Sequence, residues 1–265
     1  MAGISDGKDC NNKKFQDSLI ARFVDSGAAK LPYFYNNPSW DKYLDSLLAI
    51  CPQVASAYQL KAVPAIKNGE YTKAYELDER AVKLDPQQFV PYLGFLKCIF
   101  TKDYNGAIKD FDVANRIIPG GAEMDHGFYF YLGICYLQLG NYKEAGRNFN
   151  IDISSQRATS KTSEVHFNSL LYMALTEMGE DRFDSAIHYF NECLHIYKEL
   201  PEANYYLALI YKNKKQYYLT RKYLEIAKQS VLDGYTMNED NLFYVNYPRQ
   251  VTLFEIDEQL GLLSK

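Results

Sequence analysis

The sequence repeats itself with a period of about 34 residues, and this self-similarity constrains the fold more than any other feature. The clearest copy runs from about His126 to Gln156 and places bulky and small residues at fixed spacings: Tyr129, Leu132, Gly133, Tyr136, the turn Gly140-Asn141-Tyr142, Ala145 and Phe149. The bulky residues fill the groove of a partner helix, and the small ones let two backbones approach. One such helix pair cannot bury its apolar stripe alone, so the pattern predicts stacked pairs.

Four further copies follow the same spacing with different fidelity, at residues 55–88, 89–121, 165–199 and 201–232. In the fourth copy, residues 165–199, Tyr172 stands where the pattern places a small residue. The spacing resembles that of the tetratricopeptide repeat (TPR) superfamily, in particular bacterial members of unassigned role. The resemblance implies an all-α fold, a right-handed α-α superhelix of about five to six helix pairs closed by a C-terminal capping helix.

The same pattern predicts a division of the chain into four segments. They are a flexible N-terminal tether at 1–14, a degenerate first repeat at 15–54, the TPR solenoid at 55–232, and a loop with the capping helix at 233–265. We expect Pro248 to open that last helix, because proline is favoured in a first turn, with Val251, Phe254 and Leu260 as its buried stripe.

Charge and hydropathy limit the classes of partner. The net charge is −4, and the Lys and Arg residues are scattered, whereas nucleic-acid binding needs a basic face. No apolar run is long enough to span a bilayer, and no secretory leader is visible. We therefore expect no nucleic-acid partner and no membrane-spanning segment. Two locations stay open: the cytoplasm, or the periplasm with or without a lipid anchor if Met1-Ala2-Gly3 replaces a removed leader.

The five cysteines cannot all form pairs. Cys98 and Cys135 occupy equivalent places in successive repeats, and Cys193 takes a small-residue place on a second helix. Stacked helices lie about 8–10 Å apart, too far for a disulfide without backbone movement. We therefore predict that these three cysteines are small core residues.

The sequence carries no common catalytic or phosphate-binding motif, so we expect a non-enzymatic protein without a cofactor. One constellation could hold a metal: His188, Glu192 and His195 share one side of a predicted helix. The same helix turns Ala186 and Phe190 toward the opposite side, so an ordinary solvated face is the preferred interpretation and no metal site is predicted.

The inner face of a TPR stack is formed by the first helix of each pair, and the resemblance implies that it binds the partner. Transferred residue by residue, this partner-binding groove comprises Gln59, Lys97, Phe130, Tyr131, Gln138, Met173, Tyr205, Tyr206, Leu209, Lys212 and Asn213. An apolar and aromatic lining with a few hydrogen-bonding groups suits an extended peptide or an amphipathic helix. Replacing Tyr131 or Tyr205 by alanine should then weaken binding and leave helicity intact.

Two alternatives to an open adaptor groove remain. The chain's own first or last helix could fill the groove, in which case the aromatic residues serve packing. Alternatively, the protein is an exported, lipoprotein-like structural assembly factor of a cell-envelope complex.

Overall fold

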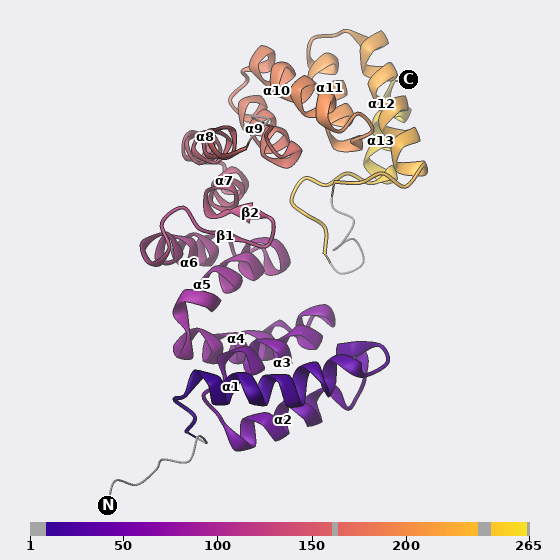
Figure 1. Cartoon of the computed structure of the whole chain (residues 1–265). Coiled ribbons are helices and arrows are strands. Elements are labelled where there is room, and N and C mark those ends of the chain that lie inside the picture. The colour runs from indigo at the N-terminus through magenta and orange to yellow at the C-terminus, as the bar shows by residue number, and fades with distance from the viewer. Residues whose placement is uncertain (1–8, 161–163, 238–244, 264–265) are drawn as a thin grey trace, which may run out of the picture. The chain divides into compact units, whose positions relative to one another are not determined.

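A computed structural model describes residues 9–160, 164–237 and 245–263 (Figure 1). Contacts divide the chain into two compact units: unit 1 contains the residues up to Gly94 together with Arg116–Ile118, and unit 2 contains Phe95–Asn115 and the residues from Pro119 onward. The boundary falls within the repeat predicted at 89–121. The prediction of an all-α repeat fold is confirmed.

Unit 1 is built from short helices followed by regular ones. They are α1 (Lys13–Ile20), the π-helix η1 (Ala21–Asp25), the 3-10 helices η2 (Ala28–Lys30) and η3 (Phe34–Asn36), α2 (Trp40–Ile50), α3 (Ala55–Lys67), α4 (Tyr71–Leu84) and most of α5 (Pro86–Leu96). The indole nitrogen of Trp40 donates to the carbonyl oxygen of Leu60 (3.0 Å) and so ties α2 to α3.

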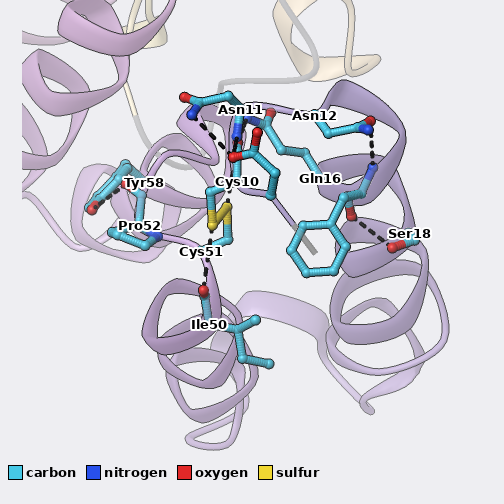
Figure 2. Close-up of a disulfide and its surroundings, with 11 residues drawn as sticks. Cys10, Asn11, Asn12, Gln16, Ser18, Ile50, Cys51, Pro52 and Tyr58 are labelled. Carbon is cyan, nitrogen blue, oxygen red and sulfur yellow. Dashed lines mark hydrogen bonds between the residues drawn. A yellow bond between two sulfur atoms is a disulfide. The ribbon is translucent and has the colours of Figure 1, made fainter. Parts of the chain in front are cut away.

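Residues 9–14, predicted as part of a flexible tether, are part of unit 1 and form hydrogen bonds within it. Asn12 caps α1 by accepting from the backbone N–H groups of Lys14 and Phe15. A disulfide joins Cys10 to Cys51 directly after α2, across 41 residues of sequence (Figure 2). Cys98, Cys135 and Cys193 are buried free thiols, as their small-residue positions predicted.

Unit 2 consists mainly of successive helix pairs. Its elements are the π-helix η4 (Lys97–Thr101), most of α6 (Tyr104–Ile117), the two-residue strands β1 (Ala122–Glu123) and β2 (His126–Gly127), α7 (Phe128–Gln138), α8 (Tyr142–Thr159), α9 (Phe167–Gly179), α10 (Phe183–Ile196), α11 (Pro201–Asn213), α12 (Tyr217–Leu232) and α13 (Leu253–Leu262). Three pairs pack together, α7 with α8, α9 with α10 and α11 with α12 (Figure 1). Strands β1 and β2 form a minimal antiparallel hairpin that the sequence did not predict.

The turn between the first and the second helix of each clear repeat contains one residue in the left-handed backbone region. These residues are Gly69, Lys102, Gly140, Asp181 and Lys215, with φ between 56° and 76°. Only two are glycines, although glycine adopts this conformation without steric cost. The five repeats therefore share this turn geometry, but only two of them carry the glycine that would indicate it in the sequence.

The second helices of the repeats share one buried position. Phe111, Phe149, Phe190 and Leu224 hold equivalent positions, and none of them has exposed surface. In α4 the equivalent residue is Asp78, which is 1% exposed and whose carboxylate oxygens have no hydrogen-bond partner within the described residues. Burial raises the pKa of Asp78 to about 8. A carboxyl group therefore replaces an apolar side chain in the core of unit 1.

The C-terminal segment differs from its prediction in two ways. Helix α13 begins at Leu253 rather than at Pro248, because Thr252 forms a capping box with Glu255. Its buried residue is Ile256, whereas Phe254 is 76% exposed. The preceding residues Asn246–Thr252 are not helical, and we call them the strap. They run alongside the C-terminal helix pairs of unit 2 (Figure 1).

Candidate binding site

Two of the predicted groove residues lie in the core of unit 2. Phe130 and Tyr131 of α7 have no exposed surface. The ring of Tyr131 stacks on Phe111 with centroids 5.0 Å apart, and its hydroxyl donates to the carbonyl oxygen of Glu123 (3.1 Å). The ring of Phe130 packs edge-on against Tyr172, at 5.6 Å. These side chains are therefore core, in contrast to the open surface predicted for them, because aromatic residues of α6 and α9 enclose α7.

The predicted groove residues of α11 are contacted by the chain's own C-terminal segment. Tyr205 packs in a cluster with Val251 and Ile256, and Leu209 packs against the same cluster. Lys212 donates from its Nζ atom to the Oε1 atom of Gln259 in α13 (2.7 Å). In this repeat the chain's own C-terminal segment covers the inner face, in agreement with the alternative in which the chain fills its own groove.

The remaining predicted groove residues lie at separate places on several helices. Lys97 forms an ion pair with Asp110 (2.6 Å). Gln138 is half-buried, and Met173 is 4% exposed. Asn213 is exposed at the end of α11, and Gln59 is half-buried in unit 1.

Four polar side chains from three parts of unit 2 bind the main chain of the strap. The Tyr172 hydroxyl donates to the carbonyl oxygen of Pro248 (2.7 Å), and the Tyr206 hydroxyl to that of Arg249 (3.0 Å). The Nζ atom of Lys102 donates to the carbonyl oxygen of Asn246 (2.6 Å), and the Oε1 atom of Glu202 accepts from the N–H of Val251 (3.3 Å). We call Lys102, Tyr172, Glu202 and Tyr206 the strap site. All four contacts are made to backbone atoms.

Burial shapes the ionisation of this site. It raises the pKa of the Tyr172 and Tyr206 hydroxyls, so both remain donors at neutral pH. Burial also raises the pKa of Glu202 to about 7, against the lowering effect of its backbone hydrogen bonds, and lowers the pKa of Lys102 to about 8. Buried polar groups are costly unless they are paired, and here the strap's backbone supplies the partners.

The strap itself forms a β-turn over Tyr247, Pro248, Arg249 and Gln250. The N–H of Gln250 donates to the carbonyl oxygen of Tyr247 (3.1 Å), and the Gln250 side chain accepts from the N–H of Tyr247 (3.0 Å). Arg249 has φ 67°. A proline at the second position followed by a positive φ at the third defines a type II turn. Tyr247 is 7% exposed, and Pro248 is buried.

Sequence reasoning missed the strap site, although Tyr206 was among the predicted residues. One signal was present: Tyr172 stands where the repeat pattern places a small residue. Its bulk is accommodated because its ring packs against those of Phe130 and Phe149, and its hydroxyl donates to the carbonyl oxygen of Pro248 in the strap. A large polar residue at a small-residue position therefore indicated an additional segment to be bound.

The histidine constellation of α10 lies beside a surface pocket of about 400 Å³ and is partly paired. The Nε2 atom of His188 is 3.7 Å from the Glu192 carboxylate, which also accepts from Arg157 (3.3 Å). In the part of the chain that the structure describes, no group of three or more His, Cys, Asp or Glu side chains is arranged to hold a metal. None of the described helices has the length and hydropathy needed to cross a membrane.

Comparison with known proteins identifies the fold. No family model matches the sequence, and no curated protein matches it. Among solved structures, PilF of Pseudomonas aeruginosa is similar with a TM-score of 0.62 at 19% identity, over 83% of this chain and 95% of that one. PilW, a type IV pilus biogenesis factor, also gives 0.62, at 15% identity over 83% and 93%. YrrB, described as a TPR protein with an unusual peptide-binding site, gives 0.52 at 16% identity over 72% and 93%. The chain therefore has the tetratricopeptide-repeat fold.

Proposed function

We propose that this protein is a non-enzymatic interaction scaffold that binds a segment of a partner protein on the first helices of its C-terminal repeats. The observation that carries the proposal is the strap site, where the buried Tyr172 of α9 and the half-buried Tyr206 of α11 donate to polypeptide main chain at 2.7 and 3.0 Å. A surface that pairs its buried polar groups with backbone atoms is suited to binding peptide.

The proposal retains three predicted groove residues of α11, which keep accessible surface and contact the C-terminal segment. Tyr206, Leu209 and Lys212 are half-buried, and each contacts the strap or α13. Tyr131 does not belong in the test, because its replacement by alanine removes a fully buried ring. Such a change costs about 3–5 kcal/mol for an aromatic core residue and would report on folding rather than binding.

Selection of peptides from a random display library against the immobilised full-length protein tests the proposal. We expect selected peptides to bind with dissociation constants in the micromolar range and to slow hydrogen exchange in α9 and α11. The second helices α10 and α12 serve as internal controls, in which exchange should not change. Failure to select any peptide, or protection confined to other helices, would contradict the proposed site.

A second candidate function, the exported assembly factor, is favoured by the disulfide between Cys10 and Cys51. Disulfides persist in oxidising compartments and are rare in the cytosol. Trapping thiols in intact cells of the source organism with a mass-tagging reagent tests this location. Export predicts that two of the five cysteines resist tagging unless the denatured protein is first reduced. Tagging of all five without reduction would contradict it.

A further inference from the structure

From the geometry of the strap we infer that the strap site is a receptor for a proline-containing β-turn, and that the strap occupies it as an internal competitor of a partner's turn. This inference rests on the proposed function and specifies the partner's chemistry and the regulation of the site. The class of partner is a protein segment with the sequence pattern aromatic-Pro-Gly-Gln in a type II turn.

The contacts select a turn rather than an extended strand or a helix. The two tyrosine hydroxyls bind the carbonyl oxygens of Pro248 and Arg249, which are consecutive residues at the centre of the turn. In an extended strand successive carbonyls point in opposite directions, and in a helix interior they are already used by the helix. Two donors from neighbouring helices therefore meet two adjacent carbonyl groups that a β-turn leaves free.

The flanking contacts fix the register of the turn. The Nζ atom of Lys102 binds the carbonyl oxygen of Asn246, one residue before the turn, and Glu202 accepts from the N–H of Val251, one residue after it. Tyr247 and Pro248 are the buried side chains. The site therefore specifies an aromatic residue followed by proline through burial, and the rest of the turn through backbone atoms.

The strap is an imperfect occupant of its own site. Arg249 takes a φ of 67° at the third position of the turn, which favours glycine. An L-residue such as arginine incurs a steric penalty there, because its Cβ atom crowds the backbone. A partner turn with Pro-Gly at its centre makes the same four backbone contacts without that penalty. Because the strap is part of the same chain, its high effective concentration favours it over a separate partner. The absence of backbone strain in a Pro-Gly turn offsets this advantage and allows the partner to displace the strap.

Direct binding of a synthetic turn to full-length protein tests this inference. The probe is the fluorescein-labelled peptide Asn-Tyr-Pro-Gly-Gln-Val-Thr, and the strap is weakened by Tyr247→Ala, which removes its buried aromatic ring. We expect the probe to bind the Tyr247→Ala chain at least tenfold more tightly than the wild-type chain, because the competitor is weakened. Adding Tyr172→Phe or Tyr206→Phe to that variant should reduce affinity at least fivefold, while Tyr218→Phe, at a position 82% exposed on α12, should not.

A peptide with Ala-Ala in place of Pro-Gly is the matched control and should bind at least tenfold more weakly. Equal affinity of the two peptides, or of the wild-type and Tyr247→Ala chains for the probe, would overturn the inference. So would self-association of the Tyr247→Ala chain, measured by sedimentation, in place of peptide binding. If display-selected peptides protect α9 and α11 while the probe fails to bind, the scaffold function stands and the turn receptor is wrong.

Discussion

The hydroxyl of Tyr172 donates to the carbonyl oxygen of Pro248 over 2.7 Å, although 76 residues separate them. This hydrogen bond is buried and connects a first helix of the repeat stack to the strap. If this buried carbonyl group lost its hydrogen-bond donor, the free-energy cost of removing the carbonyl oxygen from water would no longer be offset.

Replacement of Tyr172 by phenylalanine tests the strength of this contact. The change removes one oxygen and leaves the Pro248 carbonyl unsatisfied, so we expect a loss of about 1–3 kcal/mol. Hydrogen–deuterium exchange should accelerate at Gln250, whose N–H donates to Tyr247, and at Val251, whose N–H donates to Glu202. Unchanged exchange in Tyr172→Phe would mean that the strap is held by other contacts.

The buried carboxyl group of Asp78 makes the stability of unit 1 depend on pH. Burial raises its pKa in the folded protein to about 8, well above the ordinary value of an aspartate, so the folded state holds the proton more tightly. Stability from this group is complete below pH 4 and is lost as the pH rises toward 8, by about 1.4 kcal/mol per pH unit. Asp78→Leu, which introduces the residue of the equivalent position Leu224, should therefore stabilise the protein more at pH 8 than at pH 5.

Urea unfolding at the two pH values, with exchange in α3 and α4 as a local probe, measures this difference. Glu79→Leu is the control, since the neighbouring carboxyl group is exposed. A gain for Asp78→Leu that is the same at both pH values would show that the Asp78 carboxyl is already ionised at pH 5.

Two glycines of the third clear repeat should respond oppositely to alanine. A Cβ atom on Gly133 would lie 2.6 Å from the Cε1 atom of Phe149, so Gly133→Ala should destabilise by about 1–3 kcal/mol through overpacking. A Cβ atom on Gly146 meets only Thr176, at 3.7 Å, so Gly146→Ala should stabilise by up to about 1 kcal/mol through helix propensity. Thermal melting of both variants measures these changes in stability. Equal changes in melting temperature would refute the packing explanation.

Reduction of the disulfide should selectively weaken unit 1. Cys10 and Cys51 close a loop with a sequence separation of 41 residues, and a cross-link of this kind contributes about 2–4 kcal/mol. Melting with and without dithiothreitol measures the loss. The double variant Cys10→Ser/Cys51→Ser should melt lower and be insensitive to the reductant; sensitivity in that variant would point to a different origin.

The repeat fold was predictable because the bulky and small residues around Gly133 and Phe149 report directly on helix pairing. The open groove was not, since periodicity places a residue such as Tyr131 on the first helix but does not reveal the core rings that surround it. The strap was equally hidden: Pro248 is favoured both in a helix's first turn and in a β-turn, and only the contacts with Tyr172 and Tyr206 distinguish the two.

The strap is also synthesised after the helices that hold it. Chains are synthesised from the N-terminus, so α9 and α11 are made before Asn246–Thr252. The hydrogen bonds of Tyr172 and Tyr206 to the strap therefore form only after both helices have been synthesised.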